Sequence, residues 1–199
     1  MLELEQMAYE DDPDIILITD SWTMGYIPHA EISIPGYDTI RKDRPNRKGG
    51  GCVVYIKEEI RATTLEEEMC DNLEAVWCKM RVGGGDMVVG VCYNSTSATN
   101  EEEITLHKKI EEVCGKYGQV VICGDFNHNT IDWELLQAGH EGEAFLKLVM
   151  DKFLPQHVKQ PTRGRNILDL VLSTNPVLVN NMKDQLLWDQ VTIMWWVLT

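Results

Sequence analysis

An acidic and an amide side chain stand two residues apart at the end of an apolar run in the middle of the chain. Residues 120–123 (VVIC) are followed by Gly124, Asp125, Phe126 and Asn127. Because residues i and i+2 of an extended strand project on the same side, we expect Asp125 and Asn127 to face one cavity. Glycine, aspartate and asparagine are also ordinary turn residues, so a polar turn after a buried strand is the alternative interpretation.

Two further acids stand in similar surroundings. Asp20 follows the apolar run 15–19 (IILIT), and Asp169 lies inside the run 167–172 (ILDLVL). A turn or N-cap acid is the alternative for Asp20, whereas an acid inside an apolar strand is costly without a partner or a metal nearby. Three carboxylates on separate strands suit a hard divalent cation, and Mg²⁺ keeps waters while binding one or two of them. Such an ion could orient a water and offset charge on a phosphoryl oxygen.

Short buried strands are the elements expected to position these acids. Several apolar runs have consecutive apolar positions, which indicates strands that are covered on both faces. The expected strands span residues 14–19, 51–56, 74–80, 87–93, 119–123 and 168–173.

Three helices are expected beside these strands. The clearest begins at Asn100 as the N-cap, with Glu103 closing a capping box, and ends at Gly115 or Gly118. The others span residues 2 to about 8 and about 142–152. The sequence therefore predicts an α/β protein of the α+β type: two mostly antiparallel sheets packed face to face with helices outside, a four-layer sandwich.

The composition is that of one globular domain without a membrane signal. Of the 199 residues, 44% are apolar and 25% are charged. No apolar stretch is long enough to cross a bilayer and residues 1–5 (MLELE) are acidic, so we expect a nuclear or cytoplasmic protein with no membrane partner. The six cysteines form no C-x-x-C pair and are interpreted as small buried hydrophobic residues.

The charge distribution leaves nucleic-acid binding open. The formal net charge of −14 argues against tight nonspecific DNA binding, because proteins that grip phosphates normally present a basic face. Residues 41–48 nevertheless carry five bases in eight positions. On charge pattern alone this basic run is a solvated loop, a nuclear-import signal or a phosphate-contacting loop.

Taken in order, the motifs resemble the endonuclease domain of jockey-like LINE retrotransposons, which are non-LTR elements, within the endonuclease/exonuclease/phosphatase superfamily. The ordered set covers about the first 180 residues and is far more specific than any one motif. The motifs are residues 14–22 (DIILITDSW), 36–37 (GY), 41–44 (RKDR), 49–51 (GGG), 89–93 (VGVCY), 124–127 (GDFN), 160–164 (QPTRG) and 167–169 (ILD).

The resemblance implies a role for each matching site residue. Asp125 would orient or deprotonate the attacking water, and Asn127 would hydrogen-bond the scissile phosphate. Tyr93 would position the phosphate, although a half-buried strand aromatic is the alternative on residue type alone. Asp20 stands where the family carries its metal-binding glutamate, so Asp20 and Asp125 would hold Mg²⁺ or Mn²⁺. Asp169 would orient a catalytic histidine.

The resemblance also implies DNA as the partner. The residues expected to contact the substrate are Arg41, Arg44, Arg47, Thr162 and Arg163. The expected state is a monomer or part of a longer polyprotein with a reverse transcriptase.

Two departures from the family qualify this expectation. The family's first strand, with an early asparagine, should precede residue 1, and residues 186–190 (LLWDQ) stand near where Ser-Asp-His is expected. We therefore predict a partial domain over residues 1–180, incomplete at its N- and C-terminal strands, and a diverged tail over residues 181–199 whose three tryptophans form an exposed patch. The histidines are expected to be surface or packing residues: His29, His107, His128, His140 and His157.

Three functions follow from the resemblance. The first is a hydrolase, a metal-dependent endonuclease that nicks DNA, with activity impaired by the missing motifs. The second is a catalytically inactive remnant that is at most a weak nucleic-acid-binding module. The third is a phosphatase-type hydrolase of the same superfamily, because a fold alone does not choose a substrate.

Overall fold

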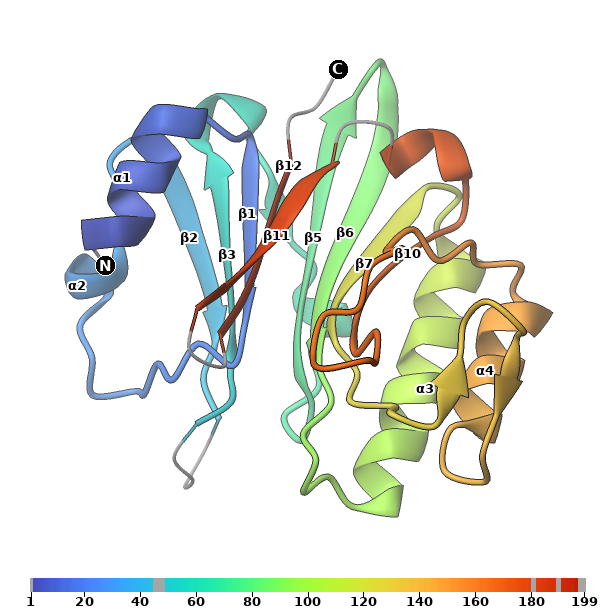
Figure 1. Cartoon of the computed structure of the whole chain (residues 1–199). Coiled ribbons are helices and arrows are strands. Elements are labelled where there is room, and N and C mark those ends of the chain that lie inside the picture. The colour runs from blue at the N-terminus through green and yellow to red at the C-terminus, as the bar shows by residue number, and fades with distance from the viewer. Residues whose placement is uncertain (1, 45–48, 180–181, 189–190, 197–199) are drawn as a thin grey trace.

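The chain forms two five-stranded sheets that pack face to face (Figure 1). The computed structural model describes residues 2–44, 49–179, 182–188 and 191–196. Side chains are described as far as Val179. Paired strands are antiparallel except β6 and β7, which run parallel. The predicted architecture of two mostly antiparallel sheets is confirmed.

The first sheet has the order β11-β12-β1-β3-β2 and the second the order β10-β7-β6-β5-β4. The strands of the first sheet are β1 (Ile15–Thr19), β2 (Tyr37–Lys42), β3 (Cys52–Lys57), β11 (Met182–Trp188) and β12 (Val191–Trp196). The strands of the second are β4 (Thr63–Thr64), β5 (Glu74–Val82), β6 (Gly85–Tyr93), β7 (Val120–Asp125) and β10 (Asp169–Ser173).

Helices cover the outer face of each sheet and complete the four layers (Figure 1). Helix α1 (Leu2–Asp11) packs on the first sheet, while α3 (Asn100–Lys116) and α4 (Glu143–Asp151) pack on the second. The shorter elements are α2 (His29–Ile32), the 3-10 helices η1 (Glu58–Ile60), η2 (Glu66–Glu68) and η3 (Pro176–Val179), and the hairpin of β8 (Ile131–Asp132) and β9 (Gln137–Ala138). No described helix is both long and apolar enough to span a membrane.

Strand β1 shows why its apolar residues are consecutive. Ile15 and Leu17 belong to the core cluster between the two sheets, whereas Ile16 and Ile18 belong to the cluster beneath α1. Both faces of the strand are therefore covered, and alternation of apolar with polar residues would bury polar groups.

Helix α3 connects the two parallel strands β6 and β7, as a parallel pair requires a crossover. Its N-cap is Thr99, whose hydroxyl accepts a hydrogen bond from the Glu102 backbone while the Glu102 carboxylate accepts one from Thr99 N–H. The predicted cap at Asn100 with Glu103 is therefore wrong by one residue. Glu103 takes no part in the capping box.

The backbone of the C-terminal segment lies inside the first sheet. In the segment predicted to be a diverged tail, β12 pairs along β1 from Ile15–Trp196 to Thr19–Thr192, and β11 pairs with β12. The predicted exposed tryptophan patch concerns side chains outside the described residues.

Candidate active site

Four candidate site residues line up at one end of the second sheet. In the strand register, Glu74 of β5 pairs with Tyr93 of β6, Tyr93 with Asp125 of β7, and Asp125 with Asp169 of β10. Paired residues on neighbouring strands project on the same face of a sheet. That face is the one toward the first sheet, because Val91, two positions before Tyr93, belongs to the core cluster between the sheets.

Asp20 joins this row from the first sheet. It follows β1 with a left-handed backbone (φ 54°), and its Oδ1 accepts a hydrogen bond from Gly50 N–H. The same loop is tied down by Trp22 N–H, which donates to Gly50 O at 3.0 Å. The glycine is needed, because a Cβ at Gly50 would collide with Glu74 and Arg44.

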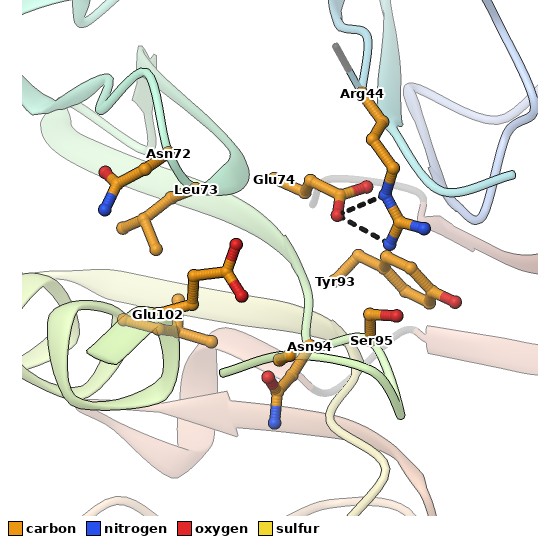
Figure 2. A pocket seen from close by; sticks show the side chains of 10 residues that line it. Arg44, Asn72, Leu73, Glu74, Tyr93, Asn94, Ser95 and Glu102 are labelled. Carbon is orange, nitrogen blue, oxygen red and sulfur yellow. Dashed lines mark hydrogen bonds and ion pairs between the residues drawn. The ribbon is translucent and has the colours of Figure 1, made fainter. Parts of the chain in front are cut away.

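Glu74 connects the two sheets at the site, as Figure 2 shows. Its Oε1 accepts hydrogen bonds from Arg44 Nε at 2.7 Å and lies 2.6 Å from a terminal nitrogen of the same guanidinium. Its Oε2 accepts a hydrogen bond from Gly51 N–H at 2.5 Å. The sequence offers no signal for Glu74, because its place opposite Tyr93 depends on the pairing register of β5 and β6.

Tyr93 stands between the acids of the two sheets. Burial raises the pKa of its phenol to about 12, with the negative charges of Asp20 and Asp125 raising it further. The guanidinium carbon of Arg44 lies 5.3 Å from the centre of its ring. At neutral pH Tyr93 therefore keeps its proton and can donate a hydrogen bond to an anion.

Asp125 is a buried acid whose charge is only partly compensated. It is 2% exposed, and burial raises the pKa of its carboxyl to about 7, with the carboxylate of Asp169 as the second cause. Arg163 acts in the opposite direction through an ion pair of 3.1 Å to Oδ2. The arginine offsets only part of the cost of placing this acid next to Asp169.

The side chains of Asn127 and Asp125 lie together as predicted, but the alternation of side chains along an extended strand is not the cause. Its backbone is left-handed (φ 54°), so the chain has already left the extended conformation on which the i, i+2 argument rests. Arg163 brings the two together, since it also donates to Asn127 Oδ1 at 3.3 Å. The Asn127 amide nitrogen donates to Asn94 O at 2.9 Å, which holds the loop on the end of β6.

The other residues expected to bind substrate are held within the fold. Thr162 is buried, and its hydroxyl accepts hydrogen bonds from the backbones of Leu168 at 3.0 Å and Asp169 at 3.1 Å. Arg41 donates to a backbone carbonyl and pairs with Asp43 at 3.5 Å. Thr162 thus fixes the start of β10, and Arg47 lies outside the described residues.

The donor set fits a hard divalent cation. Asp20 and Asp125 offer carboxylate oxygens, and a cation would counter the rise in the pKa of Asp125 that burial and, second, the charge of Asp169 cause. Among the described residues, Asp20, Asp125 and Asp169 do not meet as a trio with donor atoms within 4.8 Å. A cation shared between Asp20 and Asp125 would complete its shell with water, as Mg²⁺ prefers.

Comparisons with known proteins agree on the fold. The endonuclease domain of TRAS1, a telomere-specific non-LTR retrotransposon, superposes with a TM-score of 0.69 at 12% identity, covering 98% of this chain and 91% of that one. The 3′ phosphatase NExo from Neisseria, bound to a product DNA hairpin, gives 0.62 at 13% identity, with 97% and 92% covered. The human Nocturnin catalytic domain gives 0.57 at 14% identity, with 100% and 85% covered.

At the level of sequence, no curated protein matches the chain. A family profile described as endonuclease-reverse transcriptase matches residues 87–192, which is more than half of the chain. The match includes most of β6 and all of β7 and β10, with Tyr93, Asp125 and Asp169. The chain therefore belongs to the endonuclease-reverse transcriptase family of the endonuclease/exonuclease/phosphatase superfamily.

Proposed function

We propose that this protein is a divalent-metal-dependent endonuclease that nicks DNA, as the endonuclease of a non-LTR retrotransposon does. The observation that carries the proposal is the row of Glu74, Tyr93, Asp125 and Asp169 across the second sheet, with Asp20 facing it from the first. Placing the buried acids Asp125 and Asp169 side by side is costly in free energy, and catalytic sites are where such groups gather.

Four residues at this site are assigned a part in phosphodiester cleavage. Asp125, buried at the end of β7, accepts the proton of the attacking water as the general base. Tyr93 and Asn127 donate hydrogen bonds to the phosphate oxygens. Asp20 and Asp125 hold Mg²⁺ or Mn²⁺, which supplies charge that polarises the phosphoryl group when it is bound.

Arg163 and Arg44 support DNA as the substrate class. Arg163 is 44% exposed in its side chain and reaches both Asp125 and Asn127, so its guanidinium can exchange the carboxylate for an incoming phosphate. Arg44 lies over Tyr93 at the same end of the sheets. Association with a reverse transcriptase, in the nucleus or cytoplasm, belongs to the same proposal.

We expect the rate of DNA nicking to be low, because residues 186–190 (LLWDQ) stand near where the family carries its Ser-Asp-His motif. Four of the five histidines contact other parts of the fold, and His140 is exposed: His29 bonds the Thr39 carbonyl, His157 bonds Ser173, and His107 and His128 pack on Phe145. Losing one electrostatic or acid–base group commonly costs about a hundredfold to a thousandfold in rate.

Plasmid nicking tests the proposal. Supercoiled DNA should be nicked in Mg²⁺ or Mn²⁺, and a chelator or Asp125→Asn should abolish the product. Asp86→Asn, which removes an exposed acid on the β5–β6 hairpin, is the matched control and should nick normally. Equal nicking rates for Asp125→Asn and the wild type would contradict the proposed endonuclease activity. No nicking by any of these proteins would support the alternative that the domain is a catalytically inactive remnant.

A second substrate panel separates endonuclease from phosphatase. The 3′ phosphatase NExo shares this fold, so phosphomonoester cleavage is the competing reaction class. A DNA hairpin with a 3′ phosphate and an intact plasmid are offered at equal concentration. Release of inorganic phosphate without nicking would show that the site acts as a phosphatase and not as an endonuclease.

A further inference from the structure

Three potential metal ligands meet beneath helix α3, outside the row of acids. Glu103 and His107 lie one helical turn apart on α3, and His128 follows Asn127 in the loop after β7. One donor atom from each lies within 4.8 Å of the other two. Residues four apart share a helix face, so α3 presents a carboxylate and an imidazole side by side to the histidine of the loop.

The two imidazole nitrogens at the centre of the trio make no hydrogen bond with the residues that the structure describes. The Nε2 atoms of His107 and His128 are buried, and they lie 3.8 and 3.7 Å from Glu103 Oε1. These distances are too long for hydrogen bonds. Tetrahedral Zn²⁺ with bonds of about 2.0–2.1 Å separates its ligand atoms by about 3.4 Å. The two nitrogen–oxygen distances exceed that spacing by only a few tenths of an ångström, and all three donor atoms lie within 4.8 Å of one another.

Aromatic packing accounts for only part of this arrangement. The centres of the His107 and His128 rings lie 5.3 and 4.6 Å from the centre of Phe145, and Phe126 stacks on Phe145 at 4.9 Å. Stacking explains what the faces of the two imidazoles touch. It leaves unexplained why both Nε2 edges point at one carboxylate oxygen, since a buried nitrogen without a partner is unfavourable.

The protonation of the trio suits metal binding. Burial lowers the pKa of His107 and of His128 to about 4, so both rings are neutral near pH 7 and can offer a lone pair. Burial raises the pKa of Glu103 and the nearby charge of Glu141 raises it further, a rise that a bound cation would oppose. Neutral imidazoles and a carboxylate are the forms in which these side chains bind Zn²⁺.

We propose that Glu103, His107 and His128 form a Zn²⁺ site that fastens helix α3 to the loop after β7. Two nitrogens and one oxygen come from the protein, and the fourth position is open to water or Glu141. Because His128 adjoins Asn127, the ion would fix the loop that carries this phosphate-binding amide. The site is separate from the Asp20–Asp125 pair and does not depend on the proposed nuclease function.

Zn²⁺ and Co²⁺ titration of the metal-free protein tests the site. The wild type should bind one equivalent of Zn²⁺ and its Tm should rise, whereas Glu103→Gln should bind at least tenfold more weakly. Glu101→Gln is the matched control, because it removes an exposed acid from the same helical turn and should bind like the wild type. Glu103 is half-exposed on the helix, so its variant is expected to fold; His128→Gln provides the second ligand variant.

Visible absorption of the Co²⁺ protein identifies the ligands. Nitrogen and oxygen donors give d–d bands without the near-ultraviolet thiolate band that Cys70 or Cys114, the half-buried cysteines, would produce. Asp125→Asn, which should stop nicking, should leave the Co²⁺ spectrum unchanged. A thiolate band, no binding by the wild type, or equal binding by Glu103→Gln and Glu101→Gln would each overturn the proposal.

Discussion

Two buried acids show how the surroundings set the charge of a carboxyl group in this fold. Burial raises the pKa of Asp125 to about 7 and Asp169 adds to the rise, because Arg163 alone does not outweigh them. Burial would also raise the pKa of Glu68, yet hydrogen bonds from Lys116 and Lys109 outweigh it and leave that pKa below its usual 4.5. Glu68 is therefore a structural ion pair, whereas Asp125 still lacks positive charge that a cation can supply.

The pairing of Glu68 gives a pH-dependent prediction. Its carboxylate lies 2.5 Å from Lys116 Nζ and 3.2 Å from Lys109 Nζ, so it ties η2 to α3. A lowered folded pKa means that this stabilisation is present above about pH 4.5 and is lost as the pH falls through the folded value. Glu68→Gln should lower the free energy of unfolding by about 1–3 kcal/mol at pH 7.

Urea unfolding at neutral and acidic pH measures this loss. The difference between the wild type and Glu68→Gln should shrink as the pH falls through the lowered pKa of Glu68, below which both side chains are uncharged. Glu66→Gln, an exposed neighbour in η2, should change little at either pH. An equal loss for Glu68→Gln at both pH values would show that the ion pair is not its cause.

At the scale of the element, strand β7 depends on Gly124. Its backbone has φ 151°, and a Cβ there would collide with the Cys92 carbonyl of the neighbouring strand β6. Gly124→Ala should destabilise the fold by about 3 kcal/mol, because the backbone of β6 cannot move aside easily. Gly115→Ala, at an open position on α3, should stabilise it by about 0.5–1 kcal/mol.

Chemical denaturation of these two glycine variants is the measurement. Opposite signs are expected, and similar losses for both would show that loss of glycine flexibility, not the contact with Cys92, is responsible. Mn²⁺ binding by Gly124→Ala should weaken too, since Asp125 is the next residue.

The elements were predictable where burial covers both faces of a strand. The six expected strands match β1, β3, β5, β6, β7 and β10 within a few residues, because a doubly covered strand must be apolar throughout. Strand β2 was missed, since its residues are mostly half-exposed and leave no apolar run. The capping error at Asn100 arose because residues 99–103 (TNEEE) contain two overlapping capping boxes, and docking of α3 selects the first.

At the scale of the whole molecule, the site joins residues that the sequence holds far apart. Asp20, Tyr93, Asp125 and Asp169 were predictable because each stands at or within an apolar run, and the family motifs give their order. Glu74 and the trio of Glu103, His107 and His128 were not, because strand register and helix docking bring them together. Pairing of β12 with β1 likewise depends on contacts that no local pattern encodes.

Binding of Mn²⁺, followed by electron paramagnetic resonance, tests most directly whether acids of the two sheets share one cation. The Glu103→Gln background removes the trio beneath α3 from the measurement. In that background we expect one bound ion, and Asp20→Asn and Asp125→Asn should each weaken it at least tenfold, while Asp86→Asn should not. Unchanged Mn²⁺ affinity in Asp20→Asn would contradict a site built from both sheets.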